Sequence, residues 1–215
     1  MTAVVIADIM GSRRLAEREQ AQQILDDVTA RVEEDAPLAT RPLRPTVGDE
    51  QQAVYPGLDE ALASLLLLQL ALPEGLEFRY GIGVGAIRDI AAAAGTLTDG
   101  PGWWAAREAI EVAERKQRRA APYARTWAVA APEEDVQMHA LVRSANAQLT
   151  LRDDIVARMS DRQRRLAYGR CLGVTQRELA AQEGIGQPAV SQALASSGGT
   201  ALADAYALLL EGKGA

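Results

Sequence analysis

The hydrophobic pattern of the first 130 residues alternates between strand-like and helix-like blocks. Residues 3–9 are almost continuously apolar and include β-branched side chains, which is typical of a strand covered on both faces. Residues 14–34 place apolar side chains at helical spacing, and the apolar run within residues 59–72 predicts a nearly buried helix. Residues 77–87 alternate and contain three glycines, so we expect a central strand that another backbone or a ligand approaches closely. The pattern further predicts a helix over 103–118 and a strand over 126–132.

A hairpin is predicted between the first two helices. Residues 46–55 (TVGDEQQAVY) contain a Gly-Asp-Glu tip between two short extended runs, and prolines at 37, 42 and 45 indicate a loop that leads into it. The order is then β-α-β-β-α-β-α-β, the split arrangement of ferredoxin-like α+β folds. We therefore expect an antiparallel sheet with helices on one face.

The C-terminal part has a different pattern. Ser160 and Thr175 each precede a Gln or Glu by three residues, which predicts two capping boxes and thus two helix starts. A glycine-containing turn then leads to Pro188, a residue suited to the first position of a third helix. Two short helices around such a turn predict an all-α helix-turn-helix domain. We expect three segments: a sheet domain over 1–132, a connecting helix over 133–159 and the helix-turn-helix domain over 160–215.

Composition narrows the possible chemistry. A single cysteine excludes an intramolecular disulfide framework, and a single histidine disfavours a zinc site or a histidine-based triad. No secretory leader is recognisable, and the apolar run 61–72 is too short to span a bilayer, so we expect a cytoplasmic protein with no membrane partner. Residues 150–215 carry a net charge of +1 and the remainder −7, which leaves only the C-terminal part suited to nucleic acid.

Two carboxylates are the first candidate for a functional site. Asp8 ends the first strand and Asp49 lies at the hairpin tip, so neighbouring strands would bring both acids to one edge of the sheet. Two adjacent carboxylates repel unless a cation lies between them, which makes Asp8 and Asp49 a candidate Mg²⁺ or Mn²⁺ site facing phosphate. In the simpler interpretation, Asp8 accepts backbone N–H bonds from the following loop and Glu50 is a solvated turn residue.

Four stretches together resemble the SatD family of bacterial proteins: VVIADIMGSRR (4–14), TVGDEQQAVY (46–55), FRYGIGVGAI (78–87) and DGPGWWAAREAI (99–110). More distantly they resemble the class III nucleotidyl cyclase fold, in which an Asp-Ile-x-Gly segment and a Gly-Asp hairpin bind two metal ions on a nucleoside triphosphate. That resemblance implies Asp8 and Asp49 as metal ligands and places Gly11 and Ser12 beneath the phosphates. It also implies Arg107 as a phosphate-facing arginine, whereas helical spacing alone would pair Arg107 with Glu111.

Two departures from the cyclase pattern argue against turnover. Trp103 stands where the cyclases have a transition-state asparagine, and a tryptophan cannot accept a hydrogen bond. Pro45 stands where they have a base-selecting lysine. Loss of both groups would remove purine selection and much of the electrostatic stabilisation of the transition state. The resemblance therefore implies binding of a nucleotide or another phosphorylated ligand more than its conversion, with a Mg²⁺-dependent nucleotide-processing enzyme, using Arg107, as the alternative.

The C-terminal part resembles sigma-like bacterial helix-turn-helix domains. Gln187, Ser191 and Gln192 lie on the predicted polar side of the second helix of the motif, where glutamine can pair with adenine and serine can contact bases or phosphate. That helix contains no Arg or Lys, so Arg177 and its neighbours would supply the phosphate contacts, and two copies in a homodimer would supply two half-sites. The predicted function is a DNA-binding transcriptional regulator that senses a phosphorylated ligand; docking of another protein on the same helices is the alternative.

Overall fold

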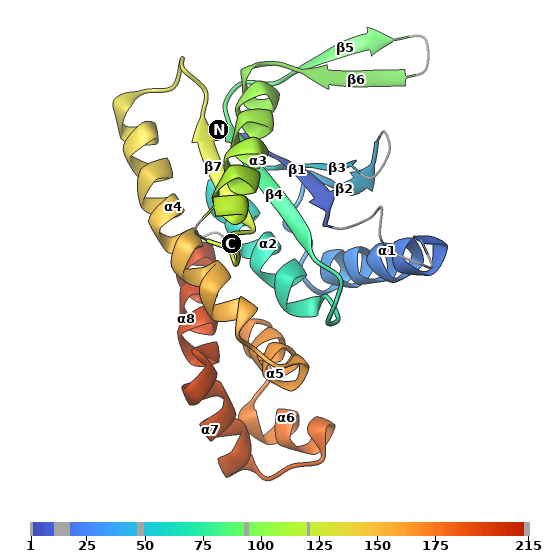
Figure 1. The fold of residues 1–215 in the computed structure, drawn as a ribbon, viewed down its shortest axis with the longest axis vertical. Coiled ribbons are helices and arrows are strands. Elements are labelled where there is room, and N and C mark those ends of the chain that lie inside the picture. The colour runs from blue at the N-terminus through green and yellow to red at the C-terminus, as the bar shows by residue number, and fades with distance from the viewer. Residues whose placement is uncertain (1, 11–17, 47–49, 93–94, 120, 213–215) are drawn as a thin grey trace. The chain divides into compact units, whose positions relative to one another are not determined.

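The computed structural model describes residues 2–10, 18–46, 50–92, 95–119 and 121–212, without the side chains of 18–21 and 90–97. The strands are β1 (Ala3–Ile9), β2 (Arg41–Pro45), β3 (Glu50–Tyr55), β4 (Phe78–Val84), β5 (Arg88–Ala92), β6 (Gly95–Asp99) and β7 (Thr126–Ala130) (Figure 1). The helices are α1 (Arg18–Asp35), α2 (Leu58–Ala71), α3 (Pro101–Arg119), α4 (Val136–Ala157), α5 (Asp161–Cys171), α6 (Gln176–Glu183), α7 (Gln187–Ser197) and α8 (Gly199–Leu210).

The main sheet has five strands in the order β2-β3-β1-β4-β7. The predicted α+β class is confirmed, but the expectation of an antiparallel sheet is wrong, because β7 pairs with β4 in parallel while the other neighbours are antiparallel. Parallel neighbours need a connection that returns the chain from the end of one strand to the edge of the sheet where that strand began. Helix α3 lies in the connection between β4 and β7 and provides this return.

Strand β2 occupies residues that the sequence assigned to a loop. Arg41, Arg44 and Pro45 pair with β3, with a register shift between the two arginines. Proline removes a backbone donor and is therefore tolerated only at a sheet edge or a bulge, and β2 is an edge strand with such an irregularity.

A second, two-stranded sheet joins β5 and β6, from Arg88 opposite Asp99 to Ala92 opposite Gly95. The hydrophobic pattern predicted neither a strand nor a helix between residues 88 and 99. Alanine and glycine have low strand propensity, so their pairing depends on the hairpin geometry rather than on local preference.

Helix α3 packs on β4, β7 and β1 (Figure 1). The strand glycines allow this approach: a Cβ on Gly83 would come within 1.9 Å of the Gly102 carbonyl oxygen, and one on Gly81 within 2.3 Å of the Ala106 oxygen. The predicted close approach at this strand is therefore that of a helix backbone. Beneath α3 lies a core of Val4, Ile6, Val54, Trp103, Ala106 and Ile110.

Helix α4 satisfies the polar groups of edge strand β7. The Asn146 side chain accepts from the Ala128 N–H and donates to the Ala128 carbonyl, both at 2.8 Å. Asp153 accepts from the N–H groups of Arg125 and Thr126 at 2.7 Å. An edge strand otherwise presents unpaired backbone groups, so this helix protects the end of the sheet.

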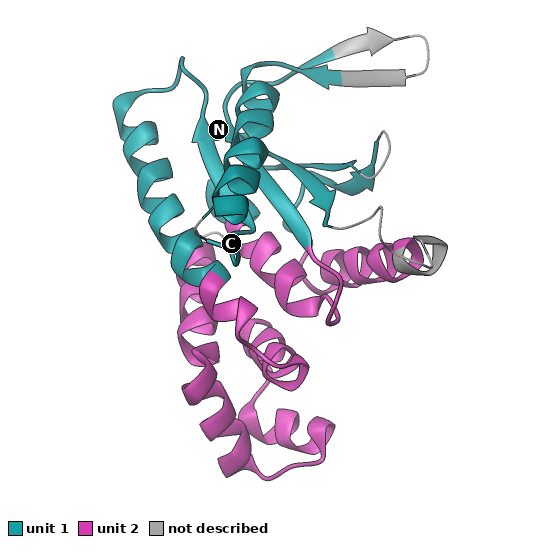
Figure 2. Ribbon diagram, in the orientation of Figure 1, with its two compact units in different colours: residues 1–14, 38–61, 78–153 teal, residues 15–37, 62–77, 154–215 magenta. Residues whose placement is uncertain are grey.

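The chain divides into two compact units, one of residues 1–14, 38–61 and 78–153, the other of 15–37, 62–77 and 154–215 (Figure 2). The division of the chain into three consecutive segments stays a prediction. In the second unit both predicted capping boxes are confirmed, at Ser160 with Gln163 and at Thr175 with Glu178. Gly184 ends α6 with φ of 65°, a conformation that favours glycine.

Within the part of the chain that the structure describes, no single helix is long and apolar enough to cross a bilayer. The pair α7 and α8 meets that length and composition only when taken together, across a bend of 76°.

Candidate functional site

A cluster of charged side chains lies where β1 ends, on the face of the sheet that carries α3. Asp8 is directly opposite Glu50 on β3 and Arg79 on β4. Residues opposite each other on neighbouring strands point to the same face. Ile6 lies two residues before Asp8 on β1, and its partner Gly81 faces α3. Side chains two residues apart on a strand share a face, so Asp8, Glu50 and Arg79 also lie on the face that carries α3.

Arg79 is the centre of this cluster. Its guanidinium lies 3.3 Å from an Asp8 carboxylate oxygen, donates to Gln117 of α3 at 2.8 Å and lies 3.8 Å from Glu114. Only 13% of the side chain is exposed, so these contacts are partly shielded from water. Arg79 thus ties the end of β1 to the last turns of α3.

Arg107 extends from α3 to β3. It donates to a Glu50 carboxylate oxygen at 2.6 Å, and the Gln52 side-chain amide donates to the other Glu50 oxygen at 3.0 Å. The alternative partner, Glu111, lies instead within 3.9 Å of Arg115. Because Arg107 is half exposed, its ion pair contributes about 0–1 kcal/mol, and an anionic ligand can compete for the guanidinium.

The predicted metal pair is described only in part. Asp8 lies in the cluster, whereas Asp49, Gly11 and Ser12 lie outside the described residues. Among the residues that the structure describes, no three acidic, histidine or cysteine side chains form a group suited to a metal ion. Asp8 and Glu50 are the two carboxylates that the register brings side by side. Each contacts an arginine, so a cation would have to compete with Arg79 or Arg107.

Two members of the cluster were missed from the sequence. Glu50 was treated as a solvated turn residue, and Arg79 was given no role. Both follow from the strand register, which the sequence does not specify. One signal was available: an arginine near the start of a predicted central strand is unusual, because charged side chains are seldom buried without a partner.

The four residues predicted to contact DNA are exposed within the second unit. Arg177 lies on α6, and Gln187, Ser191 and Gln192 lie on α7, while Val190 and Leu194 on the opposite side of α7 are buried. Helices α6 and α7 contact each other, and both also contact α5. The predicted amphipathic pattern of α7 is confirmed; a contact with DNA stays a prediction.

The fold and these two groups of residues define an α+β protein with a charged cluster on a mixed sheet and a separate group of short helices. The SatD family model matches residues 2–200, and the chain therefore belongs to the SatD family. No curated protein matches the chain.

Partial structural similarity extends to nucleotidyl cyclase domains. A guanylyl cyclase domain of a rhodopsin fusion protein from Blastocladiella emersonii is 14% identical, with a TM-score of 0.42, over 51% of this chain and 72% of that domain. The guanylyl cyclase Cya2 is 15% identical, with a TM-score of 0.41, over 52% and 69%. The adenylyl cyclase CyaB from P. aeruginosa is 17% identical, with a TM-score of 0.36, over 49% and 68%. Similarity at this level defines no activity.

Proposed function

We propose that this protein is a DNA-binding regulator whose sheet unit binds a phosphorylated ligand, such as a metal–nucleotide. The proposal of DNA binding rests on the two different faces of α7. One face is exposed and polar and could contact base edges, through Gln187, Ser191 and Gln192. The other face is apolar and packs within the second unit, through Val190 and Leu194. The αL turn at Gly184 between α6 and α7 suits a helix-turn-helix.

The charge near α7 limits the affinity that one copy would have. Among its neighbours, Arg165 and Arg162 lie near Glu183, at 2.7 and 3.5 Å, and Arg170 donates to the Val174 carbonyl. Arg177 is exposed and is the best-placed side chain for a phosphate. Few phosphate contacts mean weak binding, so the proposal includes a homodimer that presents two copies of α7 to two half-sites.

The ligand-binding half of the proposal concerns the charged cluster. Arg107 would leave Glu50 for a phosphate group, to which an arginine can donate two parallel hydrogen bonds. Release of Glu50 would then leave its carboxylate beside Asp8, and these two, with Asp49, would hold Mg²⁺ or Mn²⁺. The metal would neutralise phosphate charge and orient the ligand.

The alternative function is a Mg²⁺-dependent enzyme that processes nucleoside triphosphates, favoured by the Asp8–Glu50 pair near Arg107. Trp103 weighs against it. Trp103 is 8% exposed and packs against Val4, Ile6 and Val54. In the cyclase resemblance this position corresponds to the transition-state asparagine, but here its side chain is part of the core.

DNA binding is tested by gel shift with the DNA upstream of the protein's own gene. We expect binding that weakens steeply as salt rises, because phosphate contacts release counterions. Gln192→Ala should weaken it about 5-fold to 150-fold if the side chain pairs with a base. Gln137→Ala, an exposed glutamine on α4, is the matched control and should leave binding unchanged. Absence of a shift at low salt with a dimeric preparation would contradict the proposal.

Ligand binding is tested by calorimetry with ATP and GTP in the presence of Mg²⁺ or Mn²⁺. We expect saturable binding that Arg107→Gln weakens about tenfold or more, because a charge-assisted hydrogen bond is lost. Arg115→Gln on the same helix is the control with an equal charge change. Asp8→Asn and Asp49→Asn should each reduce the metal dependence.

The same mixtures distinguish the enzyme from the regulator. After incubation with each of the four nucleoside triphosphates, chromatography should show no product. A product that disappears in Asp8→Asn and Asp49→Asn would overturn the regulator in favour of the enzyme. If no nucleotide binds, the proposal that the sheet unit binds a phosphorylated ligand is contradicted. The proposal of DNA binding is then still tested separately by gel shift.

A further inference from the structure

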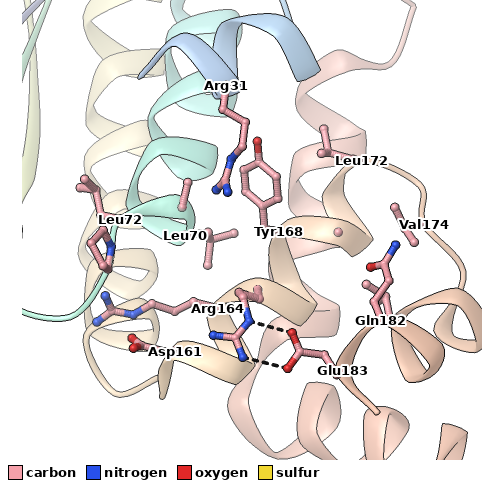
Figure 3. A pocket seen from close by; sticks show the side chains of 15 residues that line it. Arg31, Leu70, Leu72, Asp161, Arg164, Tyr168, Leu172, Val174, Gln182 and Glu183 are labelled. Atoms are coloured by element: carbon pink, nitrogen blue, oxygen red, sulfur yellow. Dashed lines mark hydrogen bonds and ion pairs between the residues drawn. The ribbon is translucent and has the colours of Figure 1, made fainter. Parts of the chain in front are cut away.

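The second compact unit contains a cavity of about 390 Å³ (Figure 3). Its wall comes from α1, from the end of α2 with the following Leu72 and Pro73, and from α5 and α6. This volume lies within the range of small-molecule sites, about 300–1,000 Å³.

Leucines form the apolar part of the wall. Leu70 and Leu72 come from the α2 side, and Leu172 follows α5 (Figure 3). Leu179 of α6 also lines the cavity. Leu70, Leu72 and Leu179 are buried, so the cavity is backed by the core of the unit. The apolar body of a ligand would remove further leucine surface from water, which favours binding.

Two arginines supply positive charge to the same cavity. The Arg31 guanidinium lies 5.0 Å above the centre of the Tyr168 ring, which orients it along the wall (Figure 3). The Arg164 Nε is buried and has no hydrogen-bond partner among the described residues. A buried donor of a charged group costs free energy unless an acceptor meets it, so Arg164 lacks one acceptor on this side.

The acids around the cavity do not supply that partner. Glu183 receives two hydrogen bonds from Arg165, at 2.7 and 2.8 Å, and these bonds hold the pKa of its carboxyl below the usual value. Asp35 accepts from the Tyr168 hydroxyl at 2.5 Å. Burial, followed by this bond, raises the pKa of Tyr168, so the hydroxyl stays a neutral donor. Asp161 is exposed on the same wall and offsets part of the positive charge of Arg31 and Arg164.

We propose that this cavity binds a small monocarboxylate with an apolar body, such as a medium-chain fatty acid. Arg164 and Arg31 would take the carboxylate, and the leucines would cover the chain. The leucines favour a ligand with an apolar body over inorganic phosphate, whose charged oxygens would lie against apolar side chains. This site is separate from the charged cluster on the sheet, and its occupation does not depend on the function proposed above.

The protein is titrated with octanoate by calorimetry, with 1-octanol as the uncharged probe of the same chain length. We expect one octanoate per chain and 1-octanol weaker by about tenfold or more, because it lacks the charge that the arginines meet. Arg164→Gln should weaken octanoate by a similar factor and leave 1-octanol nearly unchanged. Arg143→Gln, an exposed arginine on α4, carries the same charge change and should alter neither titration.

A second variant addresses a possible folding defect in Arg164→Gln, which circular dichroism would reveal. Ala71→Phe enlarges a side chain of the wall, keeps both arginines and should reduce the binding of both probes. Absence of saturable octanoate binding would overturn the proposal. Equal binding of octanoate and 1-octanol, or octanoate binding unchanged in both Arg164→Gln and Ala71→Phe, would overturn it as well.

Discussion

Replacing Gly83 with alanine is expected to destabilise the sheet unit by about 3 kcal/mol or more, the upper part of the range for overpacking. The added Cβ would lie 1.9 Å from the Gly102 oxygen and 2.4 Å from the Ala106 nitrogen. Both atoms belong to the backbone of α3, so no side-chain rotation relieves the clash and the whole helix must move off β4. Since domains are stable by only about 5–15 kcal/mol, a large part of the stability would be lost.

Urea unfolding followed by tryptophan fluorescence measures this effect, because all three tryptophans, Trp103, Trp104 and Trp127, lie in the sheet unit. Gly186→Ala is the matched control: its backbone has φ of −75°, and its nearest neighbour would be Pro188 at 3.6 Å, an ordinary contact. It should cost no more than about 1 kcal/mol, as expected for alanine at a helix N-cap, and is followed by circular dichroism. An unchanged urea midpoint for Gly83→Ala would contradict the close packing of α3 on β4.

Asp153→Ala is expected to destabilise the same unit by about 3–5 kcal/mol, the cost of breaking a buried ion pair. Asp153 accepts from Arg152 at 2.9 Å and from the backbone N–H groups of Arg125 and Thr126. Arg152 is 5% exposed, so removal of the carboxylate leaves a buried positive charge and two backbone donors without their acceptor.

The neighbouring residue provides the control for this prediction. Asp154 forms an exposed ion pair with Arg158, and Asp154→Ala should change the free energy of unfolding by less than about 1 kcal/mol. Adding Arg152→Leu to Asp153→Ala should restore part of the loss, because it removes the uncompensated buried charge. Equal urea midpoints for the two single alanine variants would show that Asp153 does not hold α4 to β7.

Local features of the fold were predictable because their causes are local. The capping boxes at Ser160 and Thr175 are confirmed, since the cap and its partner are three residues apart and need no distant contact. The order of β1, α1, β3, α2, β4, α3 and β7 agrees with the predicted one, because the apolar periodicity of each segment reflects its own burial. Edge strand β2, with its two prolines, and the alanine-rich hairpin of β5 and β6 were missed, since both depend on pairing across the sheet.

The charged cluster was predictable only in part. Asp8 and Arg107 were named from the sequence and lie on one face of the sheet, whereas Asp49, Gly11 and Ser12 lie outside the described residues. Glu50 and Arg79 join them through the register of β1 with its two neighbours. A shift of one residue would send each of these side chains to the other face, and no local preference specifies the register.

The sequence by itself determined the α+β class, most of the segments that become helices and strands, and the two faces of α7. Each of these depends on the spacing of apolar and polar residues within one segment. Only the tertiary structure decided that β7 lies parallel to β4, that Arg107 reaches Glu50 rather than Glu111, and that the Arg164 Nε is buried beside a cavity without a partner among the described residues. These outcomes join residues far apart in the chain, and the packing of several elements at once selects which of them meet.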